Sequence, residues 1–309
     1  MGIFLSTLNQ ITVLFIFIII GFILSKFNLI PDNSSTVLSK LENILFIPAL
    51  VLGTFMTNFT VNSFKKTGKL FLVSFIIAFI AMPTAILISK LTARGDKYIQ
   101  NIYTYGLTFA NFGFMGNAVV KGMFPEIFFE YLIFTLPLWI LIYLWGVPVL
   151  LISDSGKQTL GGRIKAFLNP MFIAMIIGMI IGISGLKLPS FITSVVTVSG
   201  DCMSPVAMLI TGMAVAKISL KKTFTNLKIY FISAIRLIII PLIFIGVSKI
   251  ITIPPTIFTC ALCSLAMPLG LNTIVIPSAY GKDTTVASGM TVISHLLSVI
   301  TIPLMFLFI

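Results

Sequence analysis

Long apolar stretches separated by short polar segments make up nearly the whole chain. The first five cover residues 7–25, 36–57, 69–91, 101–122 and 127–152, and the second five cover residues 169–186, 190–216, 229–249, 256–280 and 285–308. About 20 consecutive apolar residues form a helix that crosses the hydrocarbon core of a bilayer. The stretches are continuous and do not alternate with polar residues, so they indicate helices and not the strands of a membrane barrel. The sequence therefore predicts ten transmembrane helices, called spans one to ten below.

The composition agrees with a membrane protein. Of 309 residues, 58% are hydrophobic and only 9% are charged, whereas an average soluble domain carries roughly 25% charged residues. No polar segment is long enough for a soluble domain. The chain also lacks a phosphate-binding loop, a Gly-x-Ser-x-Gly motif and a His-Glu-x-x-His motif. We therefore predict an all-α polytopic membrane protein that is not an enzyme, needs no cofactor and binds no metal at a dedicated site.

The basic residues orient the protein in the membrane. The net charge is +12, which in isolation would suggest a nucleic-acid partner, but the Lys and Arg residues lie in short loops between apolar spans. Loops that follow odd-numbered spans hold 13 of them, and the opposite side holds 6. Basic residues concentrate on the cytoplasmic side of membrane proteins. We therefore predict an integral membrane protein with both termini outside and no nucleic-acid partner.

Short matches relate the two halves of the chain. Thr135–Leu138 in span five resembles Thr301–Leu304 in span ten, and Gly116–Val120 in span four resembles Leu271–Val275 in span nine. With five spans in each half, the halves would cross the membrane in opposite directions, which is the inverted repeat typical of secondary transporters. The predicted parts are a first five-helix repeat at 1–153, a cytoplasmic loop at 154–168 and a second, inverted five-helix repeat at 169–309.

Span four is unusually polar for a membrane helix. It carries two amides and two glycines at mid-depth, namely Asn111, Gly113, Gly116 and Asn117. Glycine weakens a helix, and lipid cannot satisfy amide groups. We therefore predict a broken helix that offers polar groups near the bilayer centre.

Span nine has the corresponding features. Pro268 removes a backbone hydrogen bond, Gly270 relaxes the next turn, and Asn272 and Thr273 follow. In an inverted repeat the two breaks meet near the bilayer centre, where the downstream half-helices direct their positive ends at a shared space. Such a place suits an anion. The alternative is that the amides only join neighbouring helices.

Four ionisable residues inside spans are further candidates, because charges in a membrane are costly. Asp201 in span seven could bind a proton or Na⁺, or be a neutral acid hydrogen-bonded to another helix. Glu42 in span two could couple an ion or reach the interface. His295 in span ten could titrate near neutrality or simply be a satisfied helix histidine. Arg236 in span eight could extend to the interface or contact an anionic substrate.

The motifs in spans four and nine resemble those of the auxin efflux carrier family. The segment Asn111–Gly116, continuing to Phe124 and Pro125, is similar to the family's span-four signature. The segment Met267–Asn272, continuing through Ala279–Asp283, is similar to its span-nine signature. The resemblance covers essentially the whole chain, and the short central loop is like that of bacterial members and unlike that of plant carriers. The resemblance therefore implies a location in a bacterial inner membrane, the plasma membrane of such a cell.

The resemblance implies the fold shared by sodium/bile-acid symporters and sodium/proton antiporters. Spans one, two, six and seven would form a scaffold, often a dimer, and the other six spans would form a moving unit. Transport would be of the elevator type. The substrates would be organic anions, such as auxins in plants and malate or malonate in bacteria. Carried over by motif, the substrate positions are Asn111, Gly116, Pro268 and Asn272.

The chain departs from the family at the expected crossing. Ala118 stands two residues after the span-four glycine, where the family commonly has proline, and Thr273 replaces the plant proline of span nine. Amides and glycines are therefore expected to hold the crossing. The predicted substrate-binding residues are Asn111, Gly113, Gly116, Asn117, Pro268, Gly270, Asn272 and Thr273.

These observations predict a secondary transporter of a small organic anion, in the lipid bilayer and as a homodimer through its scaffold helices. The coupling ion would be Na⁺ or H⁺, with Asp201, Glu42 and His295 as possible coupling residues. One alternative is a Na⁺-coupled symporter of another organic solute on the same fold. Another is a passive anion channel, which would conduct without saturation.

Overall fold

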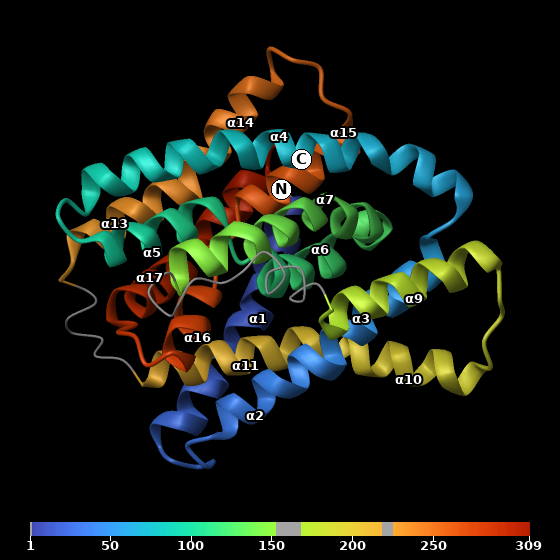
Figure 1. Ribbon diagram of the computed structural model, residues 1–309, viewed down its shortest axis with the longest axis horizontal. Helices are drawn as coiled ribbons and strands as arrows, with labels where there is room; N and C mark the ends of the chain where they lie inside the picture. The colour runs from blue at the N-terminus through green and yellow to red at the C-terminus, as the bar shows by residue number, and fades with distance from the viewer. Residues whose placement is uncertain (1, 153–167, 218–224) are drawn as a thin grey trace.

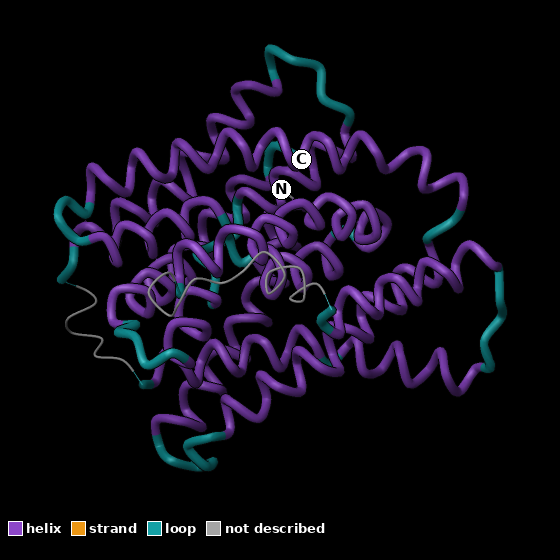
Figure 2. Tube along the Cα trace, in the orientation of Figure 1, coloured by secondary structure: helices purple, strands orange, loops and turns teal. Residues whose placement is uncertain are grey.

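The fold was analysed in a computed structural model that describes residues 2–152, 168–217 and 225–309. Every regular element in these ranges is helical, and short loops join the helices (Figures 1 and 2). The predicted all-α architecture is therefore confirmed for the described residues. The predicted cytoplasmic loop at 154–168 lies outside them except for Leu168.

The helices follow the predicted spans closely. In the labels below, α marks an α-helix and η marks a π-helix or, for η3, a 3-10 helix. In the first half they are α1 (Gly2–Lys26), α2 (Ser34–Leu41), η1 (Glu42–Phe46), α3 (Ile47–Asn58), α4 (Val61–Thr92), α5 (Lys97–Thr108), η2 (Phe112–Gly116), α6 (Asn117–Met123), η3 (Pro125–Ile127), α7 (Phe128–Leu141) and η4 (Ile142–Leu151). In the second half they are α9 (Pro170–Ser184), α10 (Ser190–Asp201), α11 (Met203–Ala216), α13 (Leu227–Ala234), η5 (Ile235–Ile239), α14 (Ile240–Ser248), α15 (Pro255–Leu265), α16 (Asn272–Ala279) and α17 (Thr285–Phe306).

Seven helical stretches in the described residues are long and apolar enough to cross a membrane, and they correspond to spans one, two, three, five, seven, eight and ten. The chain is therefore an integral membrane protein. The three other spans are shorter for physical reasons. Span six is α9, with 15 residues, and spans four and nine are each interrupted. The count of ten spans and the orientation of the termini stay predictions.

Local sequence signals set the helix ends. Thr60 accepts a hydrogen bond from the Ser63 amide at 3.2 Å, and the Ser63 hydroxyl accepts one from the Thr60 amide at 2.7 Å, which is a capping box at the start of α4. Asn169 accepts from the Phe172 amide at 3.2 Å and begins α9 just before Pro170. Gly185 ends that helix at φ +65°, in the left-handed region that glycine adopts without strain.

The helices pack in two groups. The first, called the α1 group, contains α1, α2, η1, α3, α9, α10 and α11, and its closest pairs are α1 with α11 and α3 with α9. Glycines permit these approaches. A Cβ on Gly212 would overlap the Ile18 carbonyl oxygen, and one on Gly178 would lie 2.9 Å from Cβ of Phe55. Small residues let membrane helices approach closely, so the Gly178-x-x-x-Gly182 pattern serves packing inside the chain.

The second group, called the α4 group, contains α4 to α7, η2 to η4, and α13 to α17. The long helix α4 crosses the molecule and packs on α5 and α7 (Figure 1). Helix α17 packs on α13 and η5 within this group and on α1 of the other group. The two interrupted helices belong to the α4 group, and they lie where it faces the α1 group.

Candidate functional site

The breaks in the two interrupted helices contact each other directly. Residues 109–111 separate α5 from η2, and residues 266–271 separate α15 from α16. Ala110 and Leu269 form an isolated antiparallel β-bridge. The backbone N–H of Asn111 donates to the Pro268 carbonyl at 2.7 Å. Backbone groups away from water need partners, and each break supplies them to the other. The predicted meeting of the two breaks is therefore observed in the described structure.

One turn of α17 attaches to both breaks. The Ser294 hydroxyl accepts a hydrogen bond from the Leu269 amide at 3.1 Å. The next residue, His295, lies with Nε2 at 3.1 Å from the side-chain nitrogen of Asn111, and its Nδ1 is 2.7 Å from the Thr291 carbonyl oxygen. His295 is buried. Sequence reasoning singled out His295 but missed Ser294, because a serine in an apolar helix is common and its partner lies 25 residues away.

Arg236 bonds to backbone carbonyls on the N-terminal side of both breaks. Its guanidinium donates to the carbonyls of Leu107 at 3.0 Å, Ser264 at 3.0 Å and Met267 at 3.3 Å. These carbonyls lie at the C-terminal ends of α5 and α15, which carry partial negative charge. Arg236 is only 2% exposed. The prediction that it extends to the interface is therefore wrong, because the unpaired carbonyls of the breaks hold its planar fork of donors in the interior.

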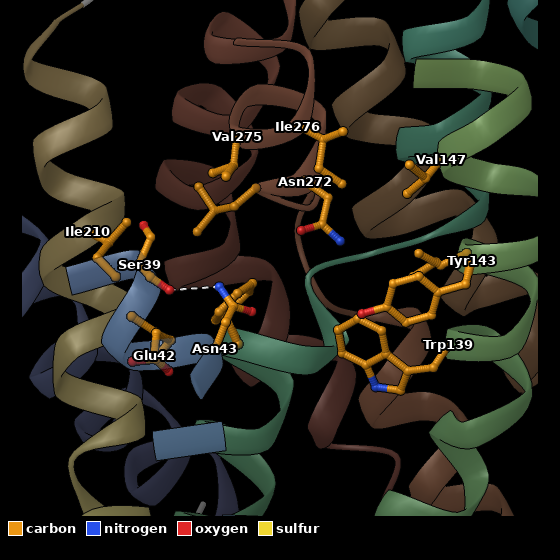
Figure 3. Close-up of a pocket in the computed structure, with 14 residues that line it drawn as sticks. Ser39, Glu42, Asn43, Trp139, Tyr143, Val147, Ile210, Asn272, Val275 and Ile276 are labelled. Atoms are coloured by element: carbon orange, nitrogen blue, oxygen red, sulfur yellow. Dashed lines mark hydrogen bonds between the residues drawn. The ribbon is translucent and has the colours of Figure 1, made fainter. Parts of the chain in front are cut away.

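A cavity of about 150 Å³ opens beside the second break, between the two groups of helices. Figure 3 shows Ser39, Glu42 and Asn43 on one side of it, and Trp139, Tyr143 and Val147 across from them. The α1 group contributes Ser39, Glu42, Asn43, Ala207 and Ile210, and the α4 group contributes Phe114, Trp139, Ile142, Tyr143, Val147, Leu271, Asn272, Val275 and Ile276. The described lining carries no Lys, Arg or His.

A second, much smaller cavity of about 10 Å³ adjoins the first at the breaks. It is lined by Asn111, Gly113 and Gly270 among others, and it shares Asn272 and Trp139 with the larger cavity. The Asn272 side-chain nitrogen donates to the Tyr105 hydroxyl at 3.1 Å. The two cavities together therefore bring Asn111, Gly113, Gly270 and Asn272 to one place.

The other predicted binding residues, Gly116, Asn117, Pro268 and Thr273, line neither cavity. The Thr273 hydroxyl donates to the Gly270 carbonyl at 2.8 Å, and the Pro268 carbonyl is bonded to Asn111 as described above. Gly116 and Asn117 are buried next to Met115 and Ala118. A Cβ on Gly113 would lie 2.6 Å from a ring carbon of Trp139, so that glycine lets the indole close one wall.

The three possible coupling residues are not together. Asp201 lies at the end of α10, has a side chain that is 58% exposed, and pairs with Lys121 on α6 at 2.6 Å. Glu42 lines the larger cavity, and both of its carboxyl oxygens are buried with no hydrogen-bond partner in the described structure. His295 contacts the first break. Their role in ion coupling stays a prediction.

Aromatic residues of the site escaped sequence reasoning. Trp139 and Tyr143, one turn apart along α7 and η4, stack with ring centroids 6.1 Å apart and form one wall of the larger cavity. Tyr105 holds Asn272. In a chain with 28 Phe residues, an aromatic ring in an apolar span carries no signal of its own, and only its place in the fold marks it.

Comparisons with known proteins identify the family to which the chain belongs. A family model described as membrane transport protein matches residues 6–306. A protein of Methanothermobacter thermautotrophicus, described as an uncharacterized transporter, is 24% identical over 98% of this chain and 98% of its own length. The uncharacterized transporter MJ1031 of Methanocaldococcus jannaschii is 23% identical over 96% of this chain and 97% of its own length. The match to the family model confirms the resemblance read from spans four and nine and the expectation of a transporter in place of an enzyme: the chain belongs to the membrane transport protein family, that of the auxin efflux carriers.

Proposed function

We propose that the protein is a secondary transporter that moves a small organic anion, of the carboxylate class, by an elevator-type movement. One observation carries the proposal: the two helix breaks meet beside a cavity whose walls come from both groups of helices. A site between two packed groups is exposed to one side or the other when one group slides along the other. That is the requirement of alternating access.

The residues of the cavity suit a small acid. Asn111 and Asn272 provide directed amide groups at the breaks, where a carboxylate would exchange its hydration shell for hydrogen bonds. Trp139, Tyr143 and aliphatic side chains would contact the apolar body of the substrate. An enclosed apolar cavity of about 150 Å³ holds a molecule the size of benzene. Malonate and malate are the acids closest to that size and are tested first, and indole-3-acetate, which is larger, tests whether the site also admits an auxin-like acid.

The proposal includes the arrangement of the chain in the membrane. It has ten spans in two inverted repeats, at 1–153 and 169–309. The α1 group is the scaffold, through which two copies dimerise, and the α4 group is the moving unit. The direct contacts between the breaks support this division, since they join α5 and η2 to α15 and α16 within the α4 group and would keep these helices together in a moving unit.

The test is uptake of radiolabelled malate, malonate and indole-3-acetate into proteoliposomes, with and without imposed Na⁺ and proton gradients. We expect saturable uptake of one acid. The substitution Asn272→Ala removes one directed donor to the carboxylate. The affinity for that acid should therefore fall roughly 10- to 100-fold. Asn58→Ala is the matched control, because Asn58 is exposed, bonds only its own helix and lies outside both cavities.

Three results would reject parts of the proposal. Wild-type affinity in Asn272→Ala would remove the breaks from the binding site. Non-saturable conduction would indicate the channel alternative. Saturable uptake of a solute that responds to Na⁺ alone would favour the Na⁺-coupled symporter, and Asp201→Asn would then show whether that carboxylate is involved.

A further inference from the structure

The contacts of His295 fix which of its ring nitrogens carries a proton. Its Nδ1 lies 2.7 Å from the Thr291 carbonyl oxygen. A carbonyl oxygen only accepts, so Nδ1 must carry the proton. In the neutral ring Nε2 is then a bare acceptor, and the Asn111 side-chain nitrogen, 3.1 Å away, donates to it. The neutral ring therefore determines the orientation of the Asn111 amide.

In this orientation the side chain of Asn111 cannot direct its NH₂ group at an anion. Its amide nitrogen is engaged with His295, and its Oδ1 is buried with no hydrogen-bond partner in the described structure. An unpaired buried acceptor is costly, and an acceptor repels a carboxylate. Asn111 lines the small cavity that adjoins the larger one. In this state the unbonded polar atom of the Asn111 side chain is an acceptor, whereas a carboxylate needs a donor.

Protonation of His295 reverses this arrangement. When Nε2 carries a proton it becomes a donor, and it can no longer face the NH₂ of Asn111. The amide then turns by half a rotation about its last bond, so that Oδ1 accepts from Nε2 and the NH₂ takes the place that Oδ1 occupied. Both polar atoms of Asn111 gain partners once a carboxylate is bound to that NH₂.

Among the described residues, the helices around His295 provide no counter-ion for a protonated ring. The described helices packed most closely on α17 carry these titratable or charged residues: Lys26 on α1, Lys228 and Tyr230 on α13, Arg236 on η5, and Cys260 and Cys263 on α15. None is a carboxylate. A buried charge without a partner is strongly disfavoured, so the protonated ring is stable only when a negative charge arrives nearby.

We propose that a proton on His295 accompanies the substrate, because the protonated ring turns the Asn111 amide so that it donates to the substrate carboxylate. The inference rests on the proposed function and adds its coupling ion. The proton is taken from water by Nε2 when the anion binds and is returned when the anion leaves, with no other bond made or broken. His295 is a positioning residue that acts through Asn111. By linkage, proton and anion raise each other's affinity by the same factor.

Ring-nitrogen NMR tests the proposal directly. The chain contains a single His, so ¹⁵N-histidine labelling in lipid nanodiscs reports His295 alone. Without acid we expect a protonated Nδ1 and a bare Nε2. With saturating malonate or indole-3-acetate at the same pH, both nitrogens should be protonated. A ring that stays neutral while the acid is bound would overturn the proposal.

The variant Asn111→Asp tests the same contact without any substrate. A carboxylate can only accept, so it should hold His295 doubly protonated at a pH where the wild-type ring is neutral. An unchanged neutral ring in Asn111→Asp would also overturn the proposal, since the atom that faces Nε2 would then have no influence on its proton.

The affinity for the anion, measured across the neutral pH range, shows whether His295 or another residue carries the coupled proton. One coupled proton weakens anion binding about tenfold for each pH unit of increase. In His295→Gln the change should be less than about twofold per unit, whereas Ser298→Ala, a buried site one turn away on α17, should keep the full slope. The slope should persist in Glu42→Gln. A slope lost in Glu42→Gln and kept in His295→Gln would assign the proton to Glu42.

The outcomes also distinguish this inference from the proposed function. A sulfonate of the same carbon skeleton stays ionised, so a slope seen with the carboxylate but not with the sulfonate would mean that the neutral acid binds, and would overturn the switch. Saturable acid uptake with a pH slope unchanged in His295→Gln rejects the switch alone. No saturable binding of any acid, together with the expected ring charge in Asn111→Asp, rejects the substrate class and not the His295–Asn111 contact.

Discussion

Arg236 offers the sharpest test of how the two helix breaks are held in the membrane interior. Its guanidinium donates to three backbone carbonyls, one from Leu107 and two from the region of the second break, at 3.0–3.3 Å. The substitution Arg236→Met keeps a long side chain of apolar character and removes all three donors. If the guanidinium stabilises the breaks, this variant should be markedly less stable than the wild type.

The magnitude follows from the contacts. A buried carbonyl left without its partner costs about 1–3 kcal/mol, so three of them cost roughly 3–9 kcal/mol. Removing the buried charge returns part of this, because burying an ion costs several kcal/mol. After this subtraction we expect Arg236→Met to lose roughly 3–5 kcal/mol, near the lower end of the carbonyl sum.

The assay is thermal unfolding of the purified protein in detergent, followed by the loss of its monodisperse peak. At about 2 °C per kcal/mol for a chain of this size, the melting temperature should fall by roughly 6–10 °C. Arg236→Lys is the matched variant. Its single ammonium keeps the charge but cannot reach all three carbonyls as a planar fork does, so an intermediate loss is expected. Melting of Arg236→Met at the wild-type temperature would refute the reasoning.

Two further predictions concern the packing and the surface. Gly212→Ala places a Cβ against the Ile18 carbonyl and should destabilise the α1–α11 contact by about 1–3 kcal/mol, whereas Gly246→Ala, whose Cβ meets nothing within 4 Å, should melt like the wild type; equal melting of both variants would contradict the close approach. Asp201→Asn breaks an exposed ion pair with Lys121 and should change stability by less than about 1 kcal/mol in the same melting assay, and a larger loss would contradict the exposed position.

The sequence predicted the elements because the bilayer leaves few options for a chain this apolar. Seven of the predicted spans are long helices, and the two spans rich in glycine, proline and amides are the interrupted ones. A Gly-x-x-Gly with flanking amides inside an apolar run conflicts with an uninterrupted helix. That conflict is visible in the sequence alone, and so the breaks near Asn111 and Asn272 were predictable.

The partners of the polar side chains were not predictable in the same way. Arg236 reads as a residue near a helix end, and Ser294 as an ordinary hydroxyl of a membrane helix. Their partners lie 28 to 129 and 25 residues away in the chain. Sequence periodicity predicts which face of a helix is polar. It does not predict which distant segment of the chain contacts that face. The aromatic wall of Trp139 and Tyr143 escaped for the same reason.

Once these partners are known, two pairs of polar residues in the interior can be contrasted. Arg236 and Ser294 bond to backbone groups that the breaks would otherwise leave without partners, so they are required by the fold whatever is transported. The carboxyl oxygens of Glu42 and Oδ1 of Asn111 have no partner in the described structure, although each residue lines one of two adjoining cavities. A fold gains nothing from a buried polar atom that bonds to nothing. Under the function proposed above, a proton on Glu42 and an anion near Asn111 would supply the partners that these atoms lack, which is why these two residues are the first to test for binding and Arg236 is the first to test for folding.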